Sequence, residues 1–238
     1  MSYSRETVRD VKALSVFSSR VYGWMTLGLS VTAFVAYTLG ASGLSMALQP
    51  FWWVCTLGTL GISFWINRRI STMSLGGVAS LFVLYAVLEG VIFGLVLPMF
   101  AKAYGGGIIW TAFLTAAVIF GMSALYGTFT KSDLTGLGKI LSMAFVGFIV
   151  ISLLFFVISM FVHLPFFYLM ISYIGLVLFT ALTAYDAHTI RRMSQEVSVE
   201  SVVSYKLSLM MALRMYLNMI MIFWYLLQIF SSSNNNRK

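Results

Sequence analysis

One carboxylate stands near the end of a long apolar run, in the segment TALTAYDAHTIRRM at 180–193. Asp186 precedes the basic pair Arg191 and Arg192 in this segment. A carboxylate at the foot of a hydrophobic helix is costly unless it is paired, hydrated or protonated, so it usually has a function. Its chemistry would then be proton exchange or ion pairing. The alternative is a charge at the water boundary that reaches out of the lipid beside its arginines.

Two further charged residues interrupt apolar segments well away from their ends. Glu89 lies near the middle of the third segment, and Arg214 lies about two turns into the last one. Glu89 is either a pathway residue or the internal counter-ion of Arg214. We favour the ion pair, because charges buried in membranes usually pair with one another. Gly90 and Gly94 follow at the spacing that lets helix backbones approach closely, which would hold Glu89 inside a bundle.

The composition indicates the class of protein that must position these residues. The 238 residues are 60% hydrophobic and only 9% charged, whereas a soluble domain carries about 25% charged residues. Long apolar runs without ten-residue alternation exclude a β-barrel, so the sequence predicts an all-α, multi-pass protein of the lipid bilayer. The net charge of +8 lies mostly between the apolar runs, so it indicates topology and not a nucleic-acid partner.

Seven apolar segments are long enough to cross or nearly cross ~30 Å of hydrocarbon at ~1.5 Å per residue. We place these transmembrane helices at 21–41, 50–67, 75–100, 107–129, 140–162, 165–190 and 206–230. Together they make one transmembrane domain over 21–230. A basic segment, 1–20, precedes this domain, and a polar tail that we expect to be disordered, 231–238, follows it.

The basic residues predict how the helices are oriented. Eleven Lys and Arg residues lie on the side of the N-terminus and three on the other side. Cytoplasmic connections carry the excess of Lys and Arg, so the N-terminus is expected in the cytoplasm and the C-terminus outside.

The chain is not expected to be an enzyme. An intramembrane serine protease needs a serine with a histidine base at depth, and both histidines lie near span ends, away from Ser123. A retinal protein would need a lysine in the middle of the seventh span, and Lys206 stands only at its start. The sequence also has no phosphate-binding loop or metal-ligand cluster.

Four stretches in order carry a family resemblance. They are VYGWMTLGLSVTAFVAY (21–37), LYGTFTKSDLTGLGKIL (125–141), YIGLVLFTALTAYDAHTI (173–190) and LRMYLNMIMIFWYLLQIF (213–230). The chain resembles the Bax inhibitor-1 family, also called the transmembrane Bax-inhibitor-motif family, and is most similar to its bacterial branch. The resemblance covers about residues 20 to 230.

This resemblance implies a seven-helix protein of the bacterial inner membrane, with six helices around a central seventh. It also implies a pH-sensitive calcium leak, gated by two aspartates near the cytoplasmic ends of the sixth and seventh helices. Asp186 matches the first aspartate, and Asn218 stands where the family usually has the second. Arg214, one turn earlier, occupies a position that is more often uncharged in similar bacterial sequences.

The asparagine changes the chemistry that the family gate implies. Two carboxylates that share a site cannot both ionise at close range, which couples such a pair to pH. Asp186 with Asn218 keeps one titrating group, and the amide can donate a hydrogen bond to it. Calcium needs several oxygen ligands of net negative charge, so Arg214, on the same helical face as Asn218, works against calcium. We expect no resident cofactor, with calcium bound at Asp186 only transiently.

Two classes of function remain open. The first is a cation leak, with calcium or protons as permeant or gating ions and with Asp186, Asn218, Arg214 and Glu89 as the pH-sensing and ion-path residues. The second is a non-conducting modulator of membrane stress or quality control. It would act through a membrane protease or another membrane partner, because some bacterial relatives are linked to such a protease.

The orientation can be tested with reporter fusions. A reporter that is active only in the periplasm should work when fused after Lys238, and a reporter that needs the cytoplasm should stay silent there. The opposite pattern would show that the orientation is inverted.

Overall fold

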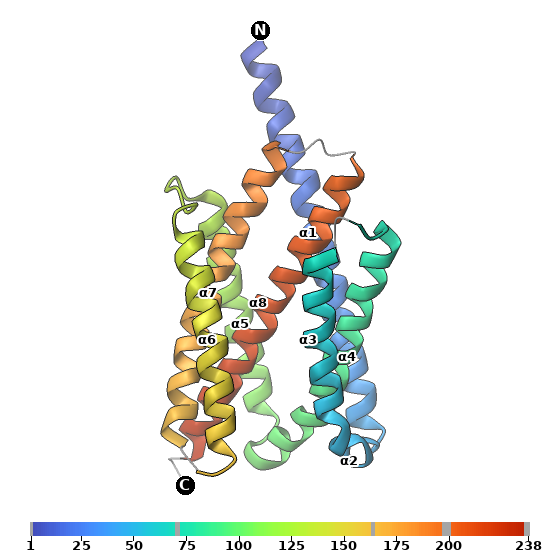
Figure 1. Ribbon diagram of the computed structural model, residues 1–238, viewed down its shortest axis with the longest axis vertical. Coiled ribbons are helices and arrows are strands. Elements are labelled where there is room, and N and C mark those ends of the chain that lie inside the picture. Colours follow the sequence, from blue (N-terminus) through green and yellow to red (C-terminus); the bar gives the residue numbers. More distant parts are fainter. Residues whose placement is uncertain (1, 70–71, 163–164, 197–200, 236–238) are drawn as a thin grey trace. The chain divides into compact units, whose positions relative to one another are not determined.

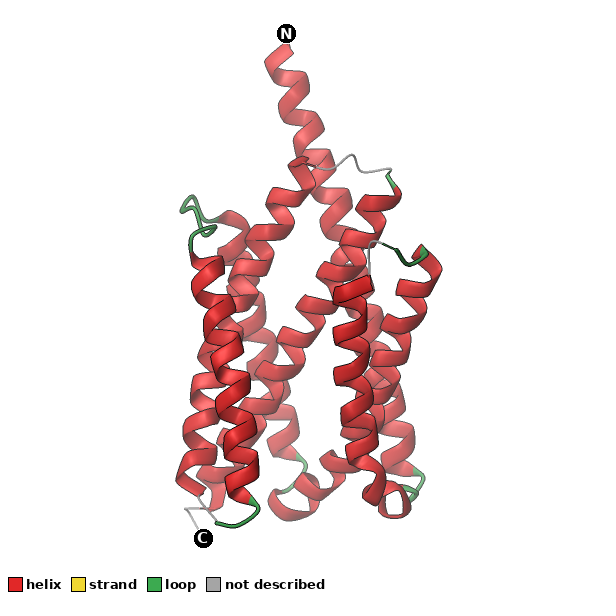
Figure 2. Ribbon diagram, viewed as in Figure 1, coloured by secondary structure: helices red, strands yellow, loops and turns green. Residues whose placement is uncertain are grey.

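The chain folds into helices throughout the part that the structure describes. This computed structural model describes residues 2–69, 72–162, 165–196 and 201–235, and these ranges contain no strand. The helices are α1 (Ser2–Ala41), α2 (Ser45–Leu48), η1 (Gln49–Phe51), α3 (Trp52–Arg69), α4 (Leu75–Tyr104), α5 (Gly107–Phe129), α6 (Leu137–Ser159), α7 (Pro165–Glu196) and α8 (Val202–Asn235) (Figures 1 and 2). The all-α prediction is confirmed.

Six of these helices contain a stretch long and apolar enough to cross a membrane. The stretches are Ser15–Ala41 in α1, Leu75–Tyr104 in α4, Gly107–Phe129 in α5, Thr135–Ser159 around α6, Phe166–Gln195 in α7 and Val202–Ser233 in α8. The chain is therefore a multi-pass membrane protein. The predicted span at 50–67 corresponds mainly to α3, whose 18 residues end in Arg68 and Arg69. α3 is short and polar at its end, and it is not one of the six stretches. The seven-span arrangement therefore stays a prediction, and so does its orientation.

Several helices extend beyond the predicted apolar limits. α1 begins at Ser2, so most of the segment 1–20 is helical. α7 continues past residue 190 to Glu196, so the basic pair lies inside the helix and not after it. α8 continues to Asn235, so most of the tail expected to be disordered is helical, and 236–238 lie outside the described residues. Hydropathy predicts where a helix meets lipid, whereas the backbone hydrogen bonds continue into polar sequence.

The helices form two compact units. The first contains residues 1–103 and 190–216, and the second contains 104–189 and 217–238. α7 and α8 are each divided between the two units, α7 after Thr189 and α8 after Tyr216. The single domain proposed over 21–230 stays a prediction.

In the first unit, α1 packs against α4 through two glycines. A Cβ atom at Gly90 would lie 2.7 Å from the Cβ of Val35, and one at Gly94 would lie 2.9 Å from the Cβ of Leu39. These separations are shorter than side chains tolerate, so only glycine fits here. The close approach predicted for Gly90 and Gly94 is confirmed.

In the second unit, aromatic rings join α6, α7 and α8. Phe148 of α6 meets Phe179 of α7 and Tyr225 of α8, with ring centroids 6.4 Å and 5.9 Å apart. α5 joins the same unit through Phe113, whose ring lies 6.3 Å from that of Phe223 in α8. Edge-to-face contacts of this kind add to the stabilisation from simple burial.

The glycines of α5 also differ in what surrounds them. A Cβ atom at Gly127 would collide with the backbone carbonyl of Ala184 in α7, whereas one at Gly121 would meet nothing within 4 Å. Gly127 therefore lets the backbones of α5 and α7 come together.

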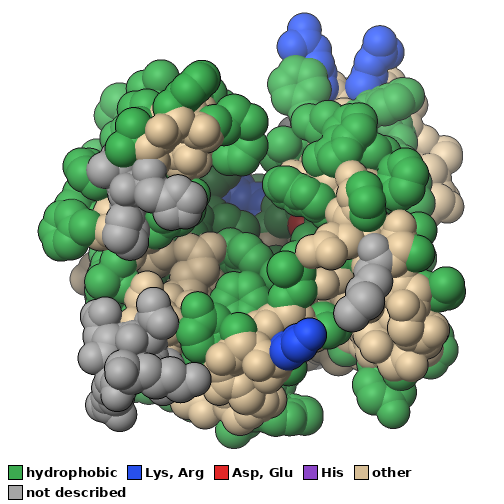
Figure 3. Space-filling view, turned by 90° about the horizontal axis from the view of Figure 1, so that it is seen from below, with side chains coloured by type: hydrophobic (Ala, Val, Ile, Leu, Met, Phe, Trp, Pro, Cys, Tyr) green, Lys and Arg blue, Asp and Glu red, His purple; other side chains and the backbone are tan. Residues whose placement is uncertain are grey.

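The outer surface is mostly apolar, as lipid contact requires. In the end-on view of Figure 3, hydrophobic side chains cover much of the described surface and Lys and Arg side chains are few. α8 is the most buried of the six spans, with 67% of its most apolar 18-residue stretch buried. α6 is the least buried, with 11% of the corresponding stretch. α6 therefore presents most of its length to lipid.

The contact at Gly127 predicts a loss of stability in Gly127→Ala. Overpacking of this kind costs about 1–3 kcal/mol, which exceeds the ~0.5–1 kcal/mol that alanine gains over glycine inside a helix. The thermal unfolding midpoint of the purified protein in detergent should fall. Gly121→Ala on the same helix serves as the control, and its midpoint should hold or rise. Equal midpoints for the two variants would contradict the close α5–α7 contact.

Candidate functional site

A buried hydrogen bond joins α7 to α8 in the second unit. The Nδ2 amide of Asn218 donates to Oδ2 of Asp186 over 2.8 Å. Asp186 is 1% exposed and Asn218 is 4% exposed, so both side chains are withdrawn from lipid and water. The expected contact between Asp186 and Asn218 is confirmed, and the Asp186 side chain is buried in protein and not exposed to water.

Glycines on two neighbouring helices hold α7 in place at this site. Gly127 of α5 lies against the carbonyl of Ala184, and Gly138 of α6 lies against the hydroxyl of Tyr185. A Cβ atom at either glycine would collide with these groups. The two residues just before Asp186 are therefore in close contact with α5 and with α6. These contacts position the turn of α7 from which the carboxylate reaches α8.

The pair has one group that can take up a proton, the Asp186 carboxylate, and one hydrogen bond between its two side chains. Burying a carboxylate is costly unless a donor satisfies it, and the Asn218 amide supplies that donor. An amide does not titrate, so protonation at this pair changes the charge of Asp186 alone. Among the described residues, no three His, Cys, Asp or Glu side chains gather as a metal-ligand cluster. Asp186 thus offers calcium one carboxylate beside one amide.

Glu89 lies in the first unit and is part of a different hydrogen-bonded group. The hydroxyl of Tyr85, one turn earlier on α4, donates to Oε1 of Glu89 over 2.9 Å. The ring of Tyr85 lies 5.9 Å from that of Tyr216 on α8, in an edge-to-face arrangement. This is the contact that the structure assigns to Glu89, and the predicted pairing of Glu89 with Arg214 stays a prediction.

A second hydrogen bond links α8 to α1 beside this group. The hydroxyls of Tyr216 and Thr32 are 2.6 Å apart, and Thr32 also donates to the carbonyl of Ala86 on α4 over 2.9 Å. Because Thr32 has one hydroxyl proton and directs it to Ala86, Tyr216 is the donor in the shorter bond. Three helices of the first unit are therefore joined by polar contacts in an otherwise apolar region.

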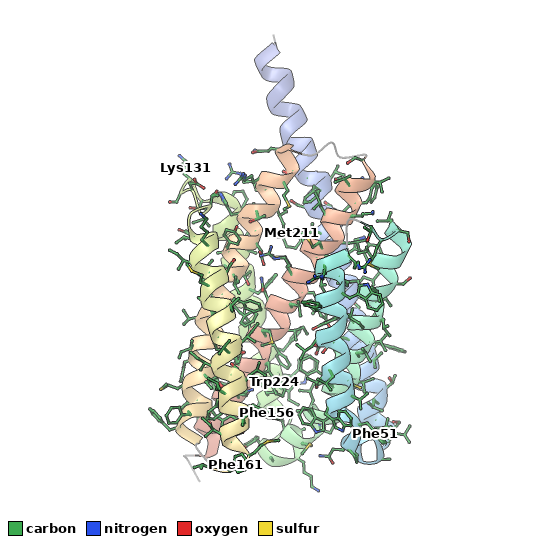
Figure 4. All side chains as sticks on the ribbon, in the orientation of Figure 1. Phe51, Lys131, Phe156, Phe161, Met211 and Trp224 are labelled. Atoms are coloured by element: carbon green, nitrogen blue, oxygen red, sulfur yellow. The ribbon has the colours of Figure 1, made fainter. Side chains whose placement is uncertain are left out.

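Arg214 lies on α8 one turn before Asn218 and is half-buried. Asn218 falls between Met211 and Trp224 on the same helix (Figure 4). Arg214 belongs to the first unit and Asn218 to the second. The effect of Arg214 on Asp186 and the ion-path roles of all four candidates stay predictions.

Sequence reasoning missed the tyrosine that donates to Glu89 and the glycines that pack against the residues before Asp186. The spacing of Tyr85 and Glu89 by four residues was a usable signal, because such pairs share one face of a helix. The contacts of Gly138 with Tyr185 and of Tyr216 with Thr32 join distant segments, and no local pattern indicates them.

Comparison with known proteins shows which sequences the chain resembles. The family model described as "Inhibitor of apoptosis-promoting Bax1" matches residues 14–235. A Chlamydia muridarum protein is 52% identical over 99% of both chains. The inner membrane protein YbhL of Escherichia coli K12 is 32% identical over 96% of this chain and 97% of its own. A Streptococcus pyogenes membrane protein is 28% identical, with the same coverage of 96% and 97%.

The Asp186–Asn218 hydrogen bond predicts energetic coupling between the two side chains. Asp186→Ala and Asn218→Ala should each change stability, and the double variant should differ from the sum of the single effects by about 0.5–2 kcal/mol. Unfolding of the purified protein in detergent or bicelles would measure all four corners of the cycle. Thr26→Ala on α1 is a control outside the pair and should be additive with either change. Additivity within the cycle would show that the bond contributes nothing.

Proposed function

The chain belongs to the Bax inhibitor-1 family, and from that premise we propose that it is a proton-sensitive cation leak of the bacterial inner membrane, gated at Asp186. The observation that carries the proposal is the buried hydrogen bond from Asn218 to Asp186. The inner-membrane location is supported by YbhL of Escherichia coli, which is named an inner membrane protein. Six helices are long and apolar enough to cross that membrane.

The gate works through the charge of Asp186. An ionised carboxylate accepts a charge-assisted hydrogen bond, which is roughly twice as strong as a neutral one. This bond ties α8 to α7 and favours the closed state. Protonation removes the charge and weakens the tie, so the population moves towards a state in which the helices separate. A proton can shift this equilibrium only because its affinity differs between the two states.

The permeant ion follows from the ligands on offer. Calcium favours sites with several oxygen ligands and net negative charge. Asn218 supplies an oxygen without charge, so this chain should pass calcium less readily than relatives with a second aspartate. Glu89, hydrogen-bonded to Tyr85, is the other acidic side chain along a proposed cation path.

Flux measurements on the purified protein in liposomes test this proposal. Calcium and proton flux would be followed from pH 5 to 8 for the wild type, Asp186→Asn and Asn218→Asp. Asp186→Asn should remove the pH dependence, since no titrating group remains at the pair. Asn218→Asp should steepen the dependence beyond the limit of about tenfold per pH unit for one proton, because two carboxylates then titrate together.

A control separates the gate from general effects of charge. Asp133 lies in the α5–α6 connection, where its carboxylate accepts the backbone amide of Thr135 over 2.9 Å. Asp133→Asn should therefore behave like the wild type. Identical profiles in all variants would make the Asp186 pair purely structural. Flux no higher than the lipid background would favour the non-conducting modulator of membrane stress, with a protease or another membrane partner.

A further inference from the structure

An open pocket lies where α6 begins, and Asp186 is not among the residues that line it. Its volume is about 460 Å³, and its lining residues are Thr135, Gly138, Lys139, Ser142, Met143 and Tyr185. All of them belong to the second unit. The connection that leads into α6 carries Lys131, which lies at one end of this unit, whereas Phe161 lies at the other end of α6 (Figure 4). The pocket is thus near an end of the helices and not in their middle.

Three of the polar side chains that line the pocket are unused donors. Within the part of the chain that the structure describes, the side chains of Lys139, Ser142 and Tyr185 form no hydrogen bond or ion pair. An ammonium and two hydroxyls can all donate to one acceptor, and the ammonium adds a positive charge. Phosphate oxygens are the acceptors that such a set suits best, since a lysine binds them as a point charge.

The Tyr185 hydroxyl packs against a neighbouring helix, and Tyr185 is partly buried. It lies against the backbone of α6 at Gly138, where no other residue would leave room for it. Gly138 is buried, whereas Lys139 and Ser142 on the following turn are exposed. One donor therefore packs against α6, while the other two are exposed and can reach a ligand.

The surface of α6 beyond the pocket is apolar and open. Lys139, Met143, Val146 and Val150 follow one another at three- and four-residue spacing, which places them on one face of the helix. Met143, Val146 and Val150 are each half or more exposed. From Lys139 to Val150 the helix rises about 16 Å, close to half of the ~30 Å hydrocarbon core. The Lys139 ammonium therefore lies at one end of an apolar stripe, Met143–Val150, and the two together are about as long as the hydrocarbon part of one leaflet.

We propose that this pocket binds the phosphate of an anionic glycerophospholipid, whose acyl chain lies along the Met143–Val150 stripe. A free phosphate would use the donors but leave the stripe without a role, so the lipid is the source that fits both features. Basic pockets between membrane helices are known to hold lipid headgroups. Asp133 of the same connection is not a lining residue. The proposal stands apart from ion flux, although Tyr185 precedes Asp186 directly.

Native mass spectrometry of the full-length protein tests the site. Purified protein would be titrated with phosphatidylglycerol, phosphatidylcholine and soluble glycerol phosphate. The wild type should retain phosphatidylglycerol in preference to phosphatidylcholine. Lys139→Gln should weaken phosphatidylglycerol binding about fivefold, the expected effect of one lysine near an anionic headgroup. Ser142→Ala should weaken it less, because the lost group is neutral.

One matched control and one variant in the apolar stripe make the result decisive. Lys131→Gln removes another exposed lysine, which lies outside the pocket, and should leave binding unchanged. Met143→Asn should weaken phosphatidylglycerol binding without affecting glycerol phosphate. Equal loss in Lys131→Gln and Lys139→Gln, or no preference for phosphatidylglycerol, would overturn the site. Competition by glycerol phosphate at matched concentration would show a free-phosphate site and overturn the lipid assignment. Unchanged unfolding midpoints would confirm that the variants are folded.

Discussion

A carboxylate buried among apolar helices needs a donor, and that need constrains the second unit. Oδ2 of Asp186 accepts a hydrogen bond from the amide of Asn218, 32 residues later on α8. A donor at that distance in sequence reaches the carboxylate only if α7 and α8 keep one register and one separation. Since an unsatisfied buried polar group costs about 1–3 kcal/mol, the aromatic packing of α6, α7 and α8 must be compatible with this bond.

Glycines make such close packing possible in a protein whose helices gain little from the hydrophobic effect within lipid. Helix association there depends on van der Waals contact and hydrogen bonds, so small residues mark the contacts. Gly127 and Gly138 bring α5 and α6 against the turn before Asp186, and Gly90 and Gly94 bring α4 against α1. Each unit therefore has close helix contacts at glycines that lie near an acidic residue or pack against its neighbours in sequence.

The two acids are satisfied in different ways, which suggests different roles. Asp186 receives an amide that cannot titrate, from another helix. Glu89 accepts a hydrogen bond from the hydroxyl of Tyr85 on its own helix. The ring of Tyr85 packs edge-to-face on Tyr216, whose hydroxyl is hydrogen-bonded to Thr32. Loss of charge at Asp186 would loosen a contact between helices. Loss of charge at Glu89 would weaken a contact within α4 and leave the link through Tyr216 and Thr32 in place.

Hydropathy alone determined the membrane class, the positions of six apolar helices and the location of Asp186 near the end of one of them. These properties depend on residues close in sequence, so periodicity and composition reveal them. Helix ends were less predictable, because α7 and α8 continue into polar sequence that lipid does not select. α3 was predicted as a span but is not among the six apolar stretches, since two arginines end its short apolar sequence. The spacing of Gly90 and Gly94 revealed a close contact, but not that α1 makes it. Only the tertiary structure decided that Asn218 donates to Asp186, that Gly138 faces Tyr185 and that Tyr216 joins Thr32, because each pair is distant in sequence and meets through helix packing.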